Sequence, residues 1–301
     1  MTLPDIHVVI VNYRSAAYTT KCVESLVEEP ISSITIVDND SGDMDRTQIE
    51  DIVREVPNAR AIFQSHNSGF GAGANRGVES LEGASEHDLV WILNPDTLVS
   101  RGAARTLAEN AKRGSRIVSP QITTGSAGDR VWFAGGDVDP ARGHVSHWGY
   151  GQEVRETDRI FECTFITGAA PMMTIETWRE LGGFREDLFL YWEDVDMSLR
   201  AKRRGVTLML VPSARVWHLE GGSSGEPSGR SKTFYYYFCK NRIVVCSDYA
   251  TIQQVILGSG FVDTVRSLLR PLREREQRFG KLASALSGTL AAIAEAFRSP
   301  R

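Results

Sequence analysis

"IHVVIVNY", residues Ile6–Tyr13, is a nearly continuous run of apolar, mostly β-branched residues that ends in polar ones. A strand that is buried on both faces has this composition, whereas a half-buried strand alternates between apolar and polar residues. Burial on both faces requires helices on both sides of a sheet. The run therefore predicts the first strand of an α/β fold.

The next hundred residues alternate between strand-like and helix-like patterns. Further strands are expected at "ISSITIVDN" (Ile31–Asn39), Ala59–Phe63 and Leu89–Leu93, and helices at Asp45–Val56, Gly71–Leu81 and Ala103–Lys112. Strands that alternate with helices imply right-handed βαβ units. We therefore expect a Rossmann-like, mostly parallel central sheet that is flanked by helices.

The pattern changes after Pro120. Short β-like runs and glycines predict antiparallel pieces and loops between Thr123 and Thr174. After this region we expect helices at Ile175–Leu181 and Glu193–Arg204 and a strand at Thr207–Pro212. The stretch "GGSSGEPSG" (Gly221–Gly229) is predicted to be flexible.

The last fifty residues have a helical pattern, which Pro271 interrupts. From Asp263 to Arg301 there are eight Lys or Arg residues against four Asp or Glu residues. One interpretation is a set of helices that pack on the main domain or on a second subunit. The other is a basic amphipathic segment on an anionic membrane surface. The sequence leaves a homodimer and a peripheral membrane contact both open.

The composition is that of an ordinary globular protein. Of the 301 residues, 42% are hydrophobic and 24% are charged, and the formal net charge is −4. No global basic field therefore points to nucleic acid as a partner. The four cysteines form no C-x-x-C pair, which favours free thiols in a reducing cytosol, and neither a signal peptide nor a spanning segment is predicted.

Polar residues follow several of the predicted strands. The first strand ends in Asn12, Tyr13 and Arg14, the second ends at Asp38, and the fourth ends in Asn94, Pro95 and Asp96. Ordinary turn chemistry explains any one of these groups. Several in succession indicate a ligand site, because ligands of open α/β sheets bind at the carboxyl ends of the strands.

The glycine-rich stretch "NSGFGAGANRG" (Asn67–Gly77) follows the third predicted strand. Gly69 to Ala74 satisfies the dinucleotide fingerprint G-x-G-x-x-G/A, but the motif does not follow the first strand, and no acid ends the next one. This placement disfavours an NAD site. The alternative is a loop that lets backbone approach a nucleotide-sugar, with Asn67, Asn75 and Arg76 as side-chain contacts.

"LYWEDVDMSLR" (Leu190–Arg200) places three carboxylates directly after two aromatic residues. Glu193, Asp194 and Asp196 are expected in the first turn of a helix, where the helix dipole favours negative charge. Asp196 has the i, i+4 spacing to pair with Arg200, and Asp194 lies on another face. A carboxylate beside aromatic residues in a cleft can act as a general base toward a hydroxyl.

Asp96 is a candidate ligand for a hard divalent cation, because Pro95 stiffens its turn. Mg²⁺ and Mn²⁺ prefer one or two carboxylates together with phosphate oxygens and water. His218, in "VWHLEGGSS", is a possible further ligand, although a lone histidine is usually structural.

Six segments in order resemble family 2 glycosyltransferases of the GT-A fold, over roughly Ile6 to Ile243. They are "VIVNYRS", "VDNDS", "NSGFGAGANRG", "NPD", the long segment from "TGAAPMM" to "LYWEDVDMSLRAKRRG", and "VWHLEGGSS". Within this family, the sequence most resembles bacterial rhamnosyltransferases and related enzymes that assemble cell-surface polysaccharides, including cell-wall polysaccharide.

The resemblance implies roles for individual residues. Asp38 contacts the nucleobase, Asp194 is the catalytic base, and Asp96 is the last acid of the family's D-x-D metal motif. Asn94 stands where that motif has its first acid. His218 matches a histidine that often reaches the metal or the diphosphate. The pocket for acceptor or sugar is then lined by Tyr191, Trp192 and Glu193.

The resemblance also implies an inverting, metal-dependent transfer from a nucleoside-diphosphate sugar to a hydroxyl of a glycan or polyprenyl-linked acceptor. dTDP-rhamnose is the first candidate donor, with UDP- and GDP-sugars open. We expect a cytoplasmic protein, either free or on the inner face of the plasma membrane. The expected division is a catalytic domain at 1–250, with a nucleotide-binding half (1–120) and an acceptor-binding half (121–250), and a helical extension at 251–301.

Two other functional classes remain open. A nucleotide-sugar or carbohydrate-binding protein without catalysis is expected to bind nucleotide tightly and turn over no donor. A glycoside hydrolase with paired carboxylates is expected to release sugar without a nucleotide, but it leaves the series Asn12, Asp38 and Asp96 unexplained.

Overall fold

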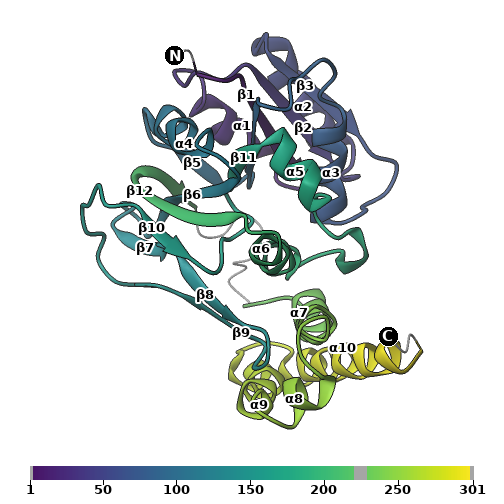
Figure 1. The fold of residues 1–301 in the computed structure, drawn as a ribbon. Coiled ribbons are helices and arrows are strands. Elements are labelled where there is room, and N and C mark those ends of the chain that lie inside the picture. The colour runs from purple at the N-terminus through teal and green to yellow at the C-terminus, as the bar shows by residue number, and fades with distance from the viewer. Residues whose placement is uncertain (1–2, 220–228, 299–301) are drawn as a thin grey trace.

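The centre of the protein is a ten-stranded sheet (Figure 1). The structure, a computed structural model, describes residues 3–219 and 229–298, so most of the stretch predicted to be flexible lies outside the described residues. The strand order is β10-β12-β6-β11-β4-β1-β2-β3, and β5 and β7 pair with β12 and β6. The first strands are β1 (Ile6–Asn12), β2 (Ser33–Asp38), β3 (Ala59–Phe63), β4 (Leu89–Leu93) and β5 (Thr97–Val99).

The sheet is mostly parallel, as the alternating pattern predicted. Strands β3, β2, β1 and β4 run in one direction. β6 (Arg116–Thr124) and β12 (Thr207–His218) are parallel to each other, and β11 (Met172–Thr174) lies antiparallel between β4 and β6. The carboxyl ends of β1, β2 and β4 therefore meet at one edge of the sheet.

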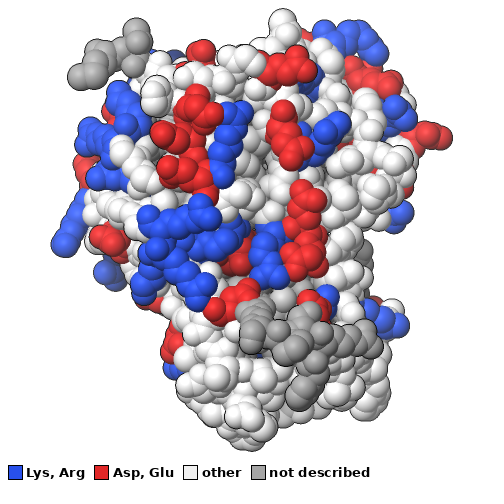
Figure 2. Space-filling view, turned by 45° about the vertical axis from the view of Figure 1, so that its right-hand side comes forward, with Lys and Arg blue, Asp and Glu red and all other residues white. Residues whose placement is uncertain are grey.

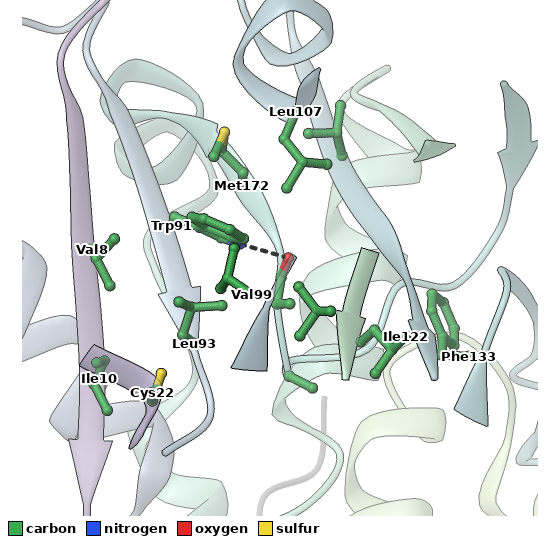
Figure 3. Close-up of a cluster of buried hydrophobic side chains, with 14 of the residues drawn as sticks. Val8, Ile10, Cys22, Trp91, Leu93, Val99, Leu107, Ile122, Phe133 and Met172 are labelled. Carbon is green, nitrogen blue, oxygen red and sulfur yellow. Dashed lines mark hydrogen bonds between the residues drawn. The ribbon is translucent and has the colours of Figure 1, made fainter. Parts of the chain in front are cut away.

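Helices cover both faces of the sheet, so β1 is buried on both sides. Val8 and Ile10 face one apolar core, and Val9 and Val11 face the other. Figure 3 shows part of the first core, in which the indole of Trp91 donates to the Ala170 carbonyl at 3.1 Å. The flanking helices are α1 (Ala16–Glu24), α2 (Asp43–Glu55), α3 (Phe70–Glu79), α4 (Ala103–Ala111), α5 (Ile175–Leu181) and α6 (Glu193–Arg203).

The region expected to hold antiparallel pieces does so. β7 (Arg130–Phe133), β8 (Gly136–Asp139), β9 (His144–His147) and β10 (Phe161–Cys163) all pair antiparallel with their neighbours. β12 was expected to end at Pro212, but it continues to His218. A break in its register between Val211 and Arg215 accommodates the proline, which has no N–H to donate to the ladder.

The last part of the chain is helical. It contains α7 (Lys232–Cys246), α8 (Ile252–Ile256), α9 (Phe261–Leu269), the 3-10 turn η2 (Arg270–Arg273) and α10 (Arg278–Arg298). Pro271 lies in η2 and separates α9 from α10, as the sequence predicted. α10 packs so closely along α7 that a Cβ on Gly288 would lie 2.1 Å from the Tyr236 carbonyl oxygen.

Arg242 ties these helices to the rest of the protein. Its buried guanidinium donates to the carbonyl oxygens of Arg142 and Gly143, next to β9, and of Val255 and Gly260, around α8. The β8–β9 ribbon reaches down from the sheet to these helices in Figure 1. One buried cation therefore fixes the helices against the ribbon.

Candidate active site

A cavity of about 980 Å³ opens at the carboxyl ends of the parallel strands. Its wall is continuous from the strand ends to the C-terminal helices. It includes Tyr13 and Arg14 after β1, and Asn94 and Pro95 after β4. The Arg14 guanidinium carbon lies 5.1 Å from the centre of the exposed Tyr13 ring. The sheet edge predicted to bind a ligand therefore forms one end of a cavity.

Asp96 and His218, the two predicted metal ligands, lie close together near this end, where His218 lines the cavity and Asp96 is buried behind its wall. His218 Nε2 lies 3.5 Å from Asp96 Oδ1, and both side chains are almost fully buried. Trp132 stacks on the His218 ring with centroids 4.6 Å apart and fixes the plane of the imidazole.

The donor set at this point suits a hard cation that is completed by substrate. Within residues 3–219 and 229–298, no group of three or more His, Cys, Asp or Glu side chains could hold a metal ion. One carboxylate and one imidazole are still adequate for Mg²⁺ or Mn²⁺, because diphosphate oxygens and water supply the remaining ligands. Two ligands on one ion at about 2.1 Å each lie roughly 3 Å apart, close to the separation observed.

Asn12 and Asp38 lie side by side at the ends of β1 and β2, but both are buried and neither lines the cavity. Asn12 Nδ2 donates to Asp38 Oδ1 at 2.8 Å. The side-chain oxygen of Asn12, Oδ1, accepts from the hydroxyls of Ser15 and Thr19. Asp38 also accepts from the Ser41 hydroxyl at 2.5 Å. In this structure the pair binds together the loops that surround the site.

The glycine loop joins the strand ends to the acidic segment. Asn67 accepts from the Gly69 N–H at 2.9 Å, and both residues line the cavity. Asn39 donates to the Gly69 carbonyl, and the Phe70 N–H donates to the Phe189 carbonyl, each at 2.9 Å. A Cβ on Gly69 would lie 2.1 Å from Phe189 O, and its φ is +94°. Gly69 is therefore required where two backbones meet.

The rest of the glycine motif serves packing. A Cβ on Gly77 would lie 2.3 Å from Val9 Cγ1, so this glycine lets α3 pack closely on β1. Asn75, a predicted donor contact, does not line the cavity. Its amide donates to the Phe184 carbonyl and to Glu186, and accepts from the Phe184 N–H. The side chain thereby holds the turn that follows α5.

The residues before α6 form a turn in a rare conformation. Phe189, Tyr191 and Trp192 have φ values of 61°, 68° and 74°. Each costs free energy of the order of 1 kcal/mol relative to ordinary backbone and persists only where the surroundings enforce it. Trp192 is the residue that precedes the first turn of α6, so this turn sets the position of Glu193 and Asp194.

Asn241 holds this turn from α7. Its buried amide nitrogen lies 2.7, 3.0 and 2.9 Å from the carbonyl oxygens of Leu188, Leu190 and Tyr191. Two hydrogens are thus shared among three acceptors. The backbone carbonyls of this turn have no partner in a helix or strand, and the single side chain of Asn241, from α7, provides hydrogen bonds to three of them.

Glu193 and Asp194 both line the cavity. Asp194 accepts from the Gly168 N–H at 3.0 Å and from the Val195 N–H at 2.8 Å. Burial raises the pKa of Asp194, and these backbone donors oppose the rise. Burial, and then the charge of Asp194, raise the pKa of Glu193, whose Oε2 has no hydrogen-bond partner among the described residues. Two adjacent carboxyl groups with raised pKa values are suited to proton transfer.

Asp196 has the separate role that its spacing predicted. It accepts from Arg200 Nε at 2.6 Å, one turn further along α6. Tyr191 and Trp192 line the cavity and pack edge-on against Phe234 and Phe238 of α7, with centroids 4.9 and 6.0 Å apart. The aromatic wall is therefore shared between the acidic segment and α7.

Sequence reasoning did not identify His147 and Trp132, which the β-ribbon region brings to the site. Both line the cavity, and His147 donates from Nδ1 to the Trp132 carbonyl at 3.1 Å. Burial lowers the pKa of His147, and the negative charge of Asp194 opposes this shift. No motif marks these residues, because the ribbon places them near Asp194 only through long-range pairing.

The chain belongs to the family 2 glycosyltransferases, since the family model described as "Glycosyltransferase like family 2" matches residues 4–233. Among curated relatives, it is 28% identical over 248 residues to an N-acetylglucosaminyl-diphospho-decaprenol L-rhamnosyltransferase of Mycobacterium tuberculosis (strain ATCC 25618 / H37Rv). That match covers 72% of this chain and 77% of the relative.

Solved structures share the fold. GalNAc-T7 with UDP, GalNAc and Mn²⁺ matches with a TM-score of 0.65 and 14% identity, over 99% of this chain. The chain spans only 58% of that protein. A mannosyltransferase of Pyrobaculum calidifontis, PcManGT, with GDP-Man and Mn²⁺ matches with a TM-score of 0.58 and 13% identity, over 100% of this chain and 77% of that one. The GT-A fold expected from the sequence is confirmed.

The role of Asn241 predicts a large effect of Asn241→Leu, which keeps the volume but removes the donors. We expect the free energy of unfolding, measured by urea titration, to fall by about 2–3 kcal/mol, because buried carbonyls lose their partners. The control is Asn110→Leu in α4, whose amide, among the described residues, donates only to the Thr106 carbonyl in the same helix. Equal losses in the two variants would contradict the role of Asn241.

Proposed function

We propose that the protein transfers a sugar from a nucleoside diphosphate to a hydroxyl of a lipid-linked glycan, with inversion at the anomeric carbon. One observation carries this proposal. The half-buried Asp194, with its raised pKa, lines the same cavity as His218 and the ends of the parallel strands. One cavity therefore contains both a candidate base for the acceptor hydroxyl and a candidate site for the diphosphate of the donor.

In this mechanism Asp194 takes the proton of the acceptor hydroxyl. The hydroxyl oxygen attacks the anomeric carbon from the face opposite the diphosphate, and the bond from that carbon to the diphosphate oxygen breaks in the same step. The N–H groups of Gly168 and Val195 hold the carboxylate in place. Tyr191 and Trp192 offer aromatic faces to the C–H surfaces of the sugars.

Asp96 and His218 are the residues that we assign to a divalent cation, Mg²⁺ or Mn²⁺. When bound, the cation neutralises the negative charge of the departing diphosphate. The stacked Trp132 keeps the His218 ring in the orientation that this role needs.

Our first candidate donor is dTDP-rhamnose, with UDP- and GDP-sugars as alternatives. The similarity to a relative named as an L-rhamnosyltransferase supports it. That relative's name also supports an acceptor in which a diphosphate joins the glycan to a polyprenol. We assign residues 1–120 to nucleotide binding, 121–250 to acceptor binding and 251–301 to a helical extension.

We further propose that this extension rests on the cytoplasmic face of the membrane. Eight large apolar residues are exposed between Leu257 and Leu290. Among them are Phe261, Leu269 and Phe279, whose exposed fractions are 51%, 51% and 69%. Outside the grey atoms, the lower part of Figure 2, where Figure 1 places α8–α10, is mostly uncharged. No helix in the described part of the chain is long and apolar enough to span a bilayer.

Asp194→Asn tests the proposed reaction. We expect transfer to fall by about 10²–10⁴-fold, because the amide accepts no proton, while affinity for the donor stays nearly unchanged. Transfer is measured with radiolabelled nucleotide-sugar and a GlcNAc-diphosphate-isoprenoid acceptor. Asp158→Asn, in an exposed loop, is the control. Full activity of Asp194→Asn would remove Asp194 from its role, and donor binding without transfer by the wild type would favour a binding protein.

Asp96→Ala tests the cation. We expect the wild type to bind nucleotide-sugar more tightly with Mn²⁺ than with chelator, and the variant to lose at least tenfold in affinity and most of this difference. Calorimetry measures both. An affinity of the wild type that chelator does not change would contradict the assignment of Asp96 and His218.

Phe261→Ser combined with Leu269→Ser tests the membrane contact. We expect about tenfold weaker binding to vesicles of phosphatidylglycerol and phosphatidylcholine, because apolar area is lost. Val27→Ser with Met44→Ser removes apolar residues that are more exposed (70% and 75%) but lie elsewhere, and this variant should bind like the wild type. Unchanged vesicle binding, or loss of a dimer in sedimentation instead, would contradict the proposal.

A further inference from the structure

The end of the cavity opposite the strand ends is basic. Asp263, Arg266, Ser267 and Arg270 line it, and their spacing of three and four residues places them on one face of α9 and its continuation. Arg230, just before α7, lines the same cavity. Three guanidinium groups from two segments therefore border one space.

The carboxylates near these arginines have other side-chain partners, and Glu274 also accepts from the backbone N–H of Arg230 at 3.4 Å. Asp263 accepts from Arg142 at 3.0 Å and lies 3.1 Å from His144 Nδ1. Glu274 accepts from the Tyr235 hydroxyl at 2.6 Å and pairs with Lys281.

The guanidinium groups of the three arginines form no ion pair with a carboxylate in the described part of the chain. The half-buried Arg230 lies 4.3 Å over the Phe234 ring, and burial and the charge of Arg270 both lower its pKa. Such an uncompensated cluster is a place for an anion.

We propose that Arg230, Arg266 and Arg270 bind the diphosphate of a lipid-linked acceptor. The inference rests on the proposed function and names the part of the acceptor that the site recognises. Guanidinium groups match phosphate oxygens in paired hydrogen bonds, and several of them together neutralise a diphosphate.

The position of the cluster favours the acceptor over the donor. The donor diphosphate is assigned to Asp96 and His218, at the strand ends. Arg230 lies instead next to Arg270 and over the Phe234 ring, on the side of the aromatic wall and the helices. An acceptor glycan whose hydroxyl reaches Asp194 therefore has its reducing-end diphosphate in reach of this end of the cavity.

The exposed apolar residues of α9 suit the lipid. Phe261, Val262 and Leu269 are each 51% exposed. Phe261 lies on the side of α9 away from Arg266 and Arg270, whereas Val262 and Leu269, four residues before and three residues after Arg266, lie beside it. A single helix thus carries a basic cavity wall and, next to it, an apolar outer surface. A diphosphate at the arginines leaves its isoprenoid chain free to follow that surface.

The test is the double substitution Arg266→Gln with Arg270→Gln, at two exposed positions where the fold should tolerate it. The probe is farnesyl diphosphate, and binding is measured by calorimetry on the full chain. We expect its affinity to fall at least tenfold, while the affinities for dTDP and UDP change less than about twofold. Arg273→Gln with Arg275→Gln, two exposed arginines outside the cavity wall, is the matched control.

Three outcomes would overturn the inference. They are no binding of farnesyl diphosphate by the wild type, equal loss in the control, and a parallel loss of dTDP and UDP affinity, which would assign the arginines to the donor. Inorganic diphosphate as a competitor distinguishes the lipid diphosphate from the free anion, because equally tight binding of both would make the site a general anion site. These measurements need no turnover, so failure of the transfer reaction is recognised separately.

Discussion

The site depends on a turn that the backbone does not adopt by itself. Phe189, Tyr191 and Trp192 all lie in the left-handed region, and Asn241 and the glycine loop hold them there. Gly69 can meet Phe189 only because it has no side chain. The glycine loop and α7 thus both hold the turn that ends at Trp192, through Phe189 and through Leu188, Leu190 and Tyr191, and α6 begins at the next residue.

This arrangement explains why adjacent acids differ. The turn brings Glu193 and Asp194 to the cavity wall, where burial raises the pKa of both. Asp196, two residues on, lies inside an ion pair with Arg200 and stabilises the helix. The base that we propose must be held in place yet remain able to accept a proton, and the backbone N–H donors to Asp194, combined with its burial, suit both needs.

The elements could be predicted from sequence more fully than the site. Apolar runs revealed the parallel strands, and spacing revealed the Asp196–Arg200 pair and the break at Pro271. Neither strand-end polarity nor the glycine-rich motif could distinguish a ligand contact from an interior hydrogen bond. Asn12, Asp38 and Asn75 were therefore expected at the cavity but lie in buried networks. Asn241 could not be found, because its partners lie some fifty residues away and only the packing of α7 joins them.

The central claim is that Asp194 activates a hydroxyl for direct displacement of the diphosphate. The most direct measurement is the anomeric configuration of the transferred sugar, determined by NMR on the product of a preparative reaction with the full chain. Direct displacement predicts a configuration opposite to that in the donor. Retention of the donor configuration would contradict the account, because it requires a different mechanism from the single displacement assigned to Asp194.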